Sequence, residues 1–390
     1  MKIVYVYPQF AHRAGTERIL IDKMNYLAES GNHDIIMLTH EQGNHPIAYP
    51  LSSKVKHVDL DVRFFPLFRY NRLTRVFKWK QHERLLQLRF NVFMQENRPD
   101  IVIAATYYVG ILSLITKCPV RTIRVLESHI DLRFILSNDP ANRKSIFRWL
   151  HMIYDMKSLV KNSQQFDVLV ALSCQDAKDW SKHLKSIVIP NVVHLNPTGH
   201  FSSLENKNVI FVGRYMEQKG IPDLLKVWEL VHKRHSDWHL DLYGEGDLKS
   251  IIEVEAQRLQ ANIHVHQPDA QIFSRYMESS ILVLTSVYEP FGLVIPEAMS
   301  CGLPIVSFDC PSGPADIITD GVNGYLIQDR DIHEFANKVC MLIESTELRV
   351  KMGKAAIVSA QRYMADAVMP LWEDLFSKLY IQHQNQKKDG

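Results

Sequence analysis

The sequence has few cysteines and no segment of biased composition, and both absences narrow the class of protein. The five cysteines in 390 residues are widely spaced, and no pair stands at the spacing of a metal-binding or redox motif. Their odd number argues against a disulfide framework, so we expect a cytoplasmic protein. Hydrophobic residues make up 46% and charged residues 23% of the chain, which excludes a disordered or fibrous class.

Targeting segments and long hydrophobic runs are also lacking. The first residues, MKIVYVYPQF, enter a strand-like run at once and have none of the parts of a secretory signal, so we do not expect secretion. One uncharged apolar stretch, 101–116, is short of the roughly 20 residues that a bilayer requires. We interpret this stretch as a buried strand that leads into a buried helix.

What the sequence does contain is an alternation of short apolar runs with segments of helical periodicity. The runs KIVYVY, HDIIMLTH, DIVIAA, TIRVLES and DVLVALS predict strands, and a helix between the first two is expected to stop at Gly31. The pattern restarts after a polar stretch at 190–208 with VIFVGR, HLDLYGEG, ILVLTS and PIVSFD. Strand, helix and strand in this order predict parallel sheets that are covered on both faces.

The length fits two domains of about 190 residues each. We expect an α/β protein with two Rossmann-like parallel-sheet domains, at 1–195 and 196–368, and a C-terminal helix at 369–390 that packs back toward the N-terminal domain. Ligands of such sheets bind beyond the carboxyl ends of the strands, so a cleft between the domains is the expected site.

The most informative motif is EPFGLVIPE at 289–297, between a predicted strand and a predicted helix. Pro290 restricts the backbone of the loop, and Gly292 removes a side chain where a ligand must approach the main chain. The amide groups at the following helix start suit a phosphate or a polar sugar. Glu297 alone could simply complement the helix dipole, but that interpretation does not explain Glu289, Pro290 and Gly292 together.

This motif resembles the retaining glycosyltransferases of family 4, which have the GT-B fold and the pattern E, any residue, FG, four residues, E. The resemblance implies that Glu289 lies beside the donor sugar and that Glu297 holds the ribose hydroxyls. It also implies that the backbone amides of Phe291, Gly292 and Leu293 contact the sugar and the phosphate.

Other family-like positions occur in the expected order along the chain. VGRYMEQKG resembles the family's strand and loop, where Arg214 and Lys219 would clamp the donor diphosphate and stabilise the charge of the leaving group. HRAGTERIL resembles the glycine loop before the first helix, although Ala14 stands beside Gly15 where the family has paired glycines. ESHIDLR places His129 where the family has a histidine that reaches the donor sugar, whereas a lone histidine is usually structural.

Two weaker patterns carry no function in our interpretation. The GEG at 244–246 lacks the third glycine of a dinucleotide-binding fingerprint. The triplets Asp59/Asp61 and Asp329/Asp331 match the Asp-x-Asp of metal-dependent transferases, but both look incidental beside the cationic clamp. We therefore expect no cofactor and no metal.

The formal net charge of +2 conceals a basic stretch at 63–90, RFFPLFRYNRLTRVFKWKQHERLLQLRF. Basic side chains interleaved with Phe, Trp and Leu suit an anionic membrane surface, while an amphipathic helix with a solvated basic face is the alternative. Nucleic acid is not expected, since no recognised nucleic-acid motif accompanies the charge.

Taken with the resemblance, these features predict a retaining, metal-independent transferase. The donor would be a nucleoside diphosphate sugar, expected to be a UDP-sugar, and the group transferred a hexose or N-acetylhexosamine. The acceptor would be a glycan or a polyprenyl-linked glycan of polysaccharide or envelope biosynthesis, with peripheral contact to the inner face of the membrane. The alternatives are a sugar-nucleotide epimerase of the GT-B fold and a non-catalytic sugar-nucleotide-binding protein.

Overall fold

The computed structural model describes residues 1–106, 108–136 and 146–388, which form two units with a parallel sheet each. One unit consists of Met1–Val192 together with Met369–Gly390, and the other of Val193–Val368. The expected α/β class with two parallel sheets is confirmed. Each of the strand-like runs named above forms a strand. Most of them are continuous apolar segments that both faces of a sheet can bury.

The sheet of the first unit has seven strands in the order β3-β2-β1-β4-β5-β6-β7. These strands are β1 (Lys2–Val6), β2 (Asp34–Thr39), β3 (Lys56–Asp59), β4 (Ile101–Ala105), β5 (Ile123–Glu127), β6 (Val168–Ala171) and β7 (Ser186–Val188). The helices of this unit are α1 (Gly15–Glu29), η1 (Phe65–Arg69), α2 (Arg72–Asn97), α3 (Val109–Thr116), α4 (Leu132–Leu136), α5 (Ile146–Ser163) and α6 (Cys174–Trp180). Gly31 follows α1 with a φ of 74°, as the expected helix stop requires.

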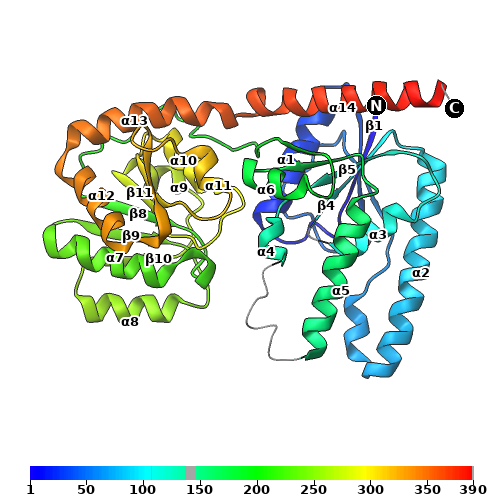
Figure 1. Ribbon diagram of the computed structural model, residues 1–390, viewed down its shortest axis with the longest axis horizontal. Helices are drawn as coiled ribbons and strands as arrows, with labels where there is room; N and C mark the ends of the chain where they lie inside the picture. Colours follow the sequence, from blue (N-terminus) through cyan, green and yellow to red (C-terminus); the bar gives the residue numbers. More distant parts are fainter. Residues whose placement is uncertain (107, 137–145, 389–390) are drawn as a thin grey trace. The chain divides into compact units, whose positions relative to one another are not determined.

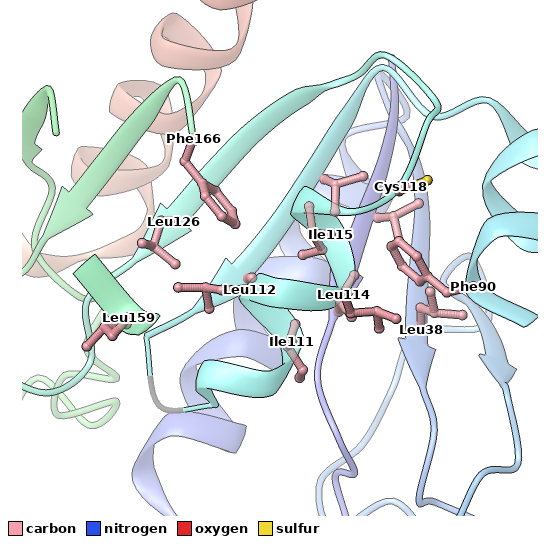
Figure 2. Close-up of a cluster of buried hydrophobic side chains, with 14 of the residues drawn as sticks. Leu38, Phe90, Ile111, Leu112, Leu114, Ile115, Cys118, Leu126, Leu159 and Phe166 are labelled. Carbon is pink, nitrogen blue, oxygen red and sulfur yellow. The ribbon is translucent and has the colours of Figure 1, made fainter. Parts of the chain in front are cut away.

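The apolar stretch at 101–116 forms the buried strand β4 and the buried helix α3, as expected, apart from residue 107, which lies outside the described residues. Figure 2 shows the side chains of Ile111, Leu112, Leu114 and Ile115 on α3 directed into a cluster with Phe90 of α2. This cluster accounts for the stretch as part of the buried core of the first unit. Among the described residues, no helix is both long enough and apolar enough to cross a membrane.

Helix α14 (Ala365–Lys388) is the last helix of the chain, and from Met369 onward it belongs to the first unit (Figure 1). The Glu373 carboxylate lies 2.6 Å from Nε2 of His33, and the Phe376 ring meets the His33 ring edge-on. The Trp372 ring lies 3.8 Å below the Nζ atom of Lys23 on α1. These contacts fix the helix against α1 and the loop that leads from α1 to β2.

The sheet of the second unit has six strands in the order β10-β9-β8-β11-β12-β13. They are β8 (Asn208–Val212), β9 (His239–Tyr243), β10 (Ile263–His266), β11 (Ile281–Leu284), β12 (Ile305–Phe308) and β13 (Gly324–Ile327). The helical segments are η3 (Glu217–Lys219), α7 (Ile221–Arg234), α8 (Lys249–Leu259), α9 (Ile272–Met277), α10 (Val294–Ser300), α11 (Gly313–Ile317), η4 (Gln328–Arg330), α12 (Ile332–Glu344), α13 (Thr346–Ala360) and η5 (Gln361–Tyr363). Figure 1 shows α7 and α8 on one face of this sheet and α9 and α10 on the other.

Strands β8 and β11 are neighbours in the second sheet although about 70 residues separate them in sequence. Because all strands are parallel, the loops that follow β8, β11 and β12 leave the sheet at one edge. The motifs that contain Arg214, Lys219 and Glu289 are on these loops, so the topology brings them together.

Candidate active site

Glu289 and Lys219 meet at the carboxyl edge of the second sheet. Their side chains, 9% and 12% exposed, form an ion pair between the loop after β11 and the turn η3 after β8. The Ser286 hydroxyl donates a second hydrogen bond to the same carboxylate oxygen, Oε2, over 3.2 Å. A carboxylate in this setting keeps a fixed position, because a cation and a hydroxyl hold it in a largely dry environment.

The backbone of Glu289 is held as firmly as its side chain. Its N–H donates to the carbonyl of Pro311 over 3.3 Å, and its carbonyl accepts from the N–H of Gly313 over 2.7 Å. Gly313 has to be glycine, because a Cβ atom there would lie 2.2 Å from the carbonyl oxygen of Phe291. The loops after β11 and β12 are therefore packed tightly against each other. A glycine is needed at Gly313 because the backbone of Phe291 approaches it closely.

Gly292 adopts a φ of 88°, which residues with a side chain rarely adopt. Its conformation turns the chain from the loop into α10, and the N–H of Ile295 donates to its carbonyl over 2.9 Å. The backbone N–H groups of Phe291, Gly292 and Leu293 have no acceptor among the described residues. Three amide donors thus stay available at the point where the sequence predicts phosphate or sugar contacts.

Glu297 lies in the first turn of α10 and is partly buried. The hydroxyl of Tyr276, on α9, donates to its Oε2 atom over 3.4 Å. Burial first, and the neighbouring Glu297 carboxylate second, raise the pKa of Tyr276 well above its ordinary value, so this hydroxyl remains a donor. The tyrosine helps to fix the orientation of Glu297.

Arg214 is exposed in the loop after β8, and its guanidinium makes no hydrogen bond or ion pair within the described residues. Nearby, the N–H of Tyr215 donates to the carbonyl of Glu245 over 2.7 Å, so this loop rests on the GEG turn. Cβ atoms at Gly244 and Gly246 would lie 1.9 Å and 2.5 Å from backbone oxygens of this loop. The GEG glycines therefore allow close backbone packing, and the sequence had predicted no function for them.

Arg330 supports the same edge and was not identified from the sequence. Its Nη1 donates to the carbonyl of Ser286 over 3.1 Å, its Nη2 to that of Thr285 over 3.2 Å, and it pairs with Asp223. The Thr285 hydroxyl in turn donates to the carbonyl of Lys219 over 3.0 Å. No local pattern marks Arg330, because its partners lie more than 40 residues away in sequence.

Cys310 lies close to this site, but its thiol is buried. Burial first, and the Glu289 carboxylate second, raise the pKa of the Cys310 thiol to about 12. The thiol therefore stays protonated at neutral pH and is no nucleophile.

The two remaining predicted residues, Gly15 and His129, belong to the first unit. Gly15 is the first residue of α1, whose N-cap residue, Ala14, provides no side-chain cap. His129 follows β5 with its side chain 3% exposed, and its Nε2 atom lies 3.0 Å from Oε2 of Glu127. The structure thus gives His129 a buried carboxylate partner, which sequence reasoning did not identify.

Glu127 is itself paired with Lys23, whose Nζ atom lies 2.6 Å from Oε2. Burial raises the pKa of Glu127, but the attraction of Lys23 and the hydrogen bond of His129 outweigh this effect and lower the pKa overall. The carboxylate therefore stays charged and fixes the orientation of the His129 ring.

The Asp-x-Asp triplets have structural uses. Asp59 accepts from the Thr39 hydroxyl over 3.0 Å and from the N–H of Gly43 over 2.8 Å. Asp331 caps α12 by accepting from the N–H of Glu334 over 3.0 Å, and the Asp329 side chain lies outside the described part of the structure.

The chain is similar to known glycosyltransferases. Residues 197–358 match the family model described as Glycosyl transferases group 1. An uncharacterized glycosyltransferase of Haemophilus influenzae is 26% identical over 379 residues, which cover 96% of this chain and 99% of that protein. The poly(ribitol-phosphate) alpha-N-acetylglucosaminyltransferase of Staphylococcus aureus is 29% identical over 57% of this chain and 46% of its own length.

The fold has close matches among solved structures. A variant of S. aureus TarM, solved in complex with fondaparinux, alpha-GlcNAc-glycerol and UDP, is similar with a TM-score of 0.72 and 16% identity. The match covers 96% of this chain and 99% of that one. The solved structures thus give the GT-B fold, and the family match together with the glycosyltransferase relatives gives the class, a glycosyltransferase. The residues that match the Glycosyl transferases group 1 model lie in the second unit and include Lys219 and Glu289.

Proposed function

We propose that this glycosyltransferase moves a hexose or N-acetylhexosamine from a UDP-sugar to a glycan or lipid-linked glycan acceptor, with retention and without a metal. The observation that carries the proposal is the Lys219–Glu289 ion pair beside Gly292, at the carboxyl edge of the second sheet. The UDP bound to the TarM variant and the poly(ribitol-phosphate) in the name of the S. aureus relative support the donor and the acceptor class. Polysaccharide or envelope biosynthesis is the corresponding setting.

In this proposal the cationic side chains and free amides receive the diphosphate. Arg214 is exposed and has no side-chain partner among the described residues, so a diphosphate would replace solvent there. Lys219 is already positioned by Glu289, and the amides of Gly292 and Leu293 add donors without charge. Departure of UDP builds negative charge, and preorganised donors of this kind lower the barrier because they need no rearrangement.

The carboxylates have separate tasks. Glu289, held by Lys219 and Ser286, would contact hydroxyls of the donor sugar near the reacting carbon. Glu297, oriented by Tyr276, would bind the ribose hydroxyls. Retention would follow from attack on the face that UDP leaves, with a phosphate oxygen accepting the proton of the acceptor hydroxyl. Gly15 and His129 are proposed to contact the donor from the first unit.

An anionic membrane surface is proposed as the location of the acceptor, and the surface formed by η1 and α2 supports it. Phe65, Leu73 and Phe77 are 81%, 85% and 65% exposed, which is unusual for large apolar side chains of a soluble protein. Exposed Arg69 and Arg72 lie among them. Peripheral membrane proteins insert apolar side chains below the lipid headgroups, and neighbouring cationic side chains attract the anionic headgroups. We propose the inner face of the cell membrane as the location.

A donor screen with released nucleotide as the readout tests the central proposal. UDP-sugars with an acceptor glycan should give UDP and a product with the anomeric configuration of the donor, in the presence of a chelator. Each UDP-sugar alone should give only slow release of UDP. Formation of a new UDP-sugar epimer would instead identify an epimerase, and tight UDP binding without any turnover would identify a binding protein.

Vesicle flotation tests the membrane proposal. The protein should float with phosphatidylglycerol vesicles and not with phosphatidylcholine vesicles, and the triple change Phe65→Ser, Leu73→Ser, Phe77→Ser should abolish this. The change Ile251→Ser with Val254→Ser on α8 is the matched control, since those side chains are 51% and 62% exposed in the other unit. Equal flotation of the triple variant would contradict the proposal.

A further inference from the structure

The edge of the second sheet carries a group of histidines around one carboxylate, none of which is assigned to the donor site above. His239 and Asp241 alternate with Leu240 and Leu242 along β9, so they point to the face opposite the apolar core. His264 and His266 do the same on β10, and His264 stands opposite Asp241 in the register of the two strands. Two adjacent strands thus direct four ligand-type side chains to one place.

The distances within this group suit a shared ion. One nitrogen each of His239 and His264 and one carboxylate oxygen of Asp241 all lie within 4.8 Å of one another. Nδ1 of His264 is 3.0 Å from Oδ1 of Asp241, and Nε2 of His239 is 3.8 Å from Oδ2. In a tetrahedral zinc site, bonds of about 2.1 Å separate the ligand atoms by about 3.4 Å, so small side-chain movements complete the site.

Further side chains hold the carboxylate from behind, as they do in established metal sites. The Asn208 amide donates to Oδ2 of Asp241 over 3.0 Å, and Asn208 is itself buried. Nε2 of His266 lies 3.3 Å from Oδ1, and the His266 ring stacks on Tyr243 with 4.5 Å between ring centroids. Asp241 is therefore fixed at the base of the group, while the exposed His264 leaves a path for an ion.

We propose that His239, Asp241 and His264 bind a divalent transition metal, with zinc as the best fit, and that Asn208 and His266 position Asp241. Imidazole nitrogens and a carboxylate oxygen are ligands that zinc prefers, and water would occupy the fourth position. The site goes beyond the proposed transfer reaction. Asp241 lies in the middle of β9, before the strand's carboxyl end, so the ion would join the edge strand β10 to β9 and stay out of the chemistry.

Zinc titration of the full-length protein tests this site. Protein freed of metal by dialysis against a chelator, and carrying Cys174→Ser to remove the exposed thiol, should take one zinc per chain from a chromophoric chelator. Asp241→Asn preserves the size of the side chain and removes its charge, and His264→Gln removes an exposed ligand. Each should weaken zinc binding by about 100-fold or more, because even outer-shell changes at zinc sites cost about 10–100-fold.

His333→Gln is the matched control, since His333 is an exposed histidine of the same unit. It should leave zinc affinity unchanged, and zinc should raise the midpoint of thermal unfolding of the control but not of Asp241→Asn. Absence of zinc uptake, or equal uptake and equal thermal shifts in all three variants, would overturn the proposal. Turnover of UDP-sugar by the metal-free protein tests the transfer reaction separately, because loss of turnover there would contradict metal-independent transfer and leave the zinc titration unaffected.

Discussion

Lys219 and Glu289 form a largely buried ion pair although 70 residues separate them in the chain. Neighbouring parallel strands, β8 and β11, bring their loops together, and Arg330 fixes the loop after β11 through the carbonyls of Thr285 and Ser286. The pair therefore contributes to the stability of the fold and, in our proposal, to donor binding. Substitutions can separate its effect on stability from its effect on turnover.

Glu289→Gln is expected to lower kcat by about 100-fold to 1,000-fold, the range for loss of one preorganised electrostatic group. The amide keeps the size of the side chain and can still accept from the Ser286 hydroxyl, so the fold should be preserved. Steady-state turnover of UDP-sugar, with circular dichroism as the folding check, measures the effect. The control is Glu229→Gln, which breaks an exposed pair with Lys233 in the same unit. Equal turnover of the two variants would contradict a role for Glu289 in the reaction.

Gly313→Ala is expected to raise the KM for the donor and to destabilise the protein by about 1–3 kcal/mol, as added volume in a packed site usually does. The new Cβ atom would lie 2.2 Å from the Phe291 carbonyl oxygen and would push the backbone at Phe291 out of its position beside Glu289. Gly110→Ala is the control, because a Cβ atom there meets nothing within 4 Å. Donor titrations and urea unfolding of both variants measure the difference. An unchanged KM in Gly313→Ala would show that the loop tolerates the displacement.

The strands of the two sheets and the turn at 289–297 could be predicted from the sequence because their determinants are local. Continuous apolar runs mark buried parallel strands, and EPFGLVIPE contains its own turn, glycine and carboxylates within nine residues. The less hydrophobic strands β7 and β10 and the short β13 were missed. Ile263–His266 alternates apolar and polar residues at a sheet edge, and a four-residue alternation carries little information.

Long-range partners could not be predicted. Arg330 reaches Ser286 across 44 residues, and Lys23 reaches Glu127 across 104 residues, with no pattern in either segment to indicate the pairing. For the same reason the sequence identified His129 but not the carboxylate that orients it. Such contacts follow from the strand order of the sheet, which periodicity does not specify.

Lys23→Met alone is expected to destabilise the first unit by about 3–5 kcal/mol, because it leaves the buried Glu127 carboxylate without its cation. Adding Glu127→Gln should recover most of the loss, since a neutral amide tolerates burial and can still accept from His129. Free energies of unfolding for the two single variants and the double variant give the coupling energy. Strict additivity of the two changes would show that the pair does not act as a unit.

Asp176 gives the first unit a pH dependence with a definite sign. Burial raises the pKa of this carboxyl group to about 7, against 3.8 for the free side chain. The folded state therefore holds its proton over a range in which the unfolded state has released it. Asp176 should reduce the free energy of unfolding progressively as pH rises from about 4 to about 7, with a total of at most about 4 kcal/mol.

Asp176→Asn removes this titration. In the parent, the N–H of Leu132 donates to Oδ1 of Asp176 over 2.9 Å, and the amide oxygen of the variant can accept the same hydrogen bond. The variant should be similar to the parent near pH 4 and more stable than the parent above about pH 7. Urea unfolding at both pH values measures the difference, with Asp34→Asn as a control, since Asp34 is exposed at the start of β2. A stability difference between parent and Asp176→Asn that stays constant with pH would mean that Asp176 is charged throughout, and that its hydrogen bonds rather than its burial control the proton.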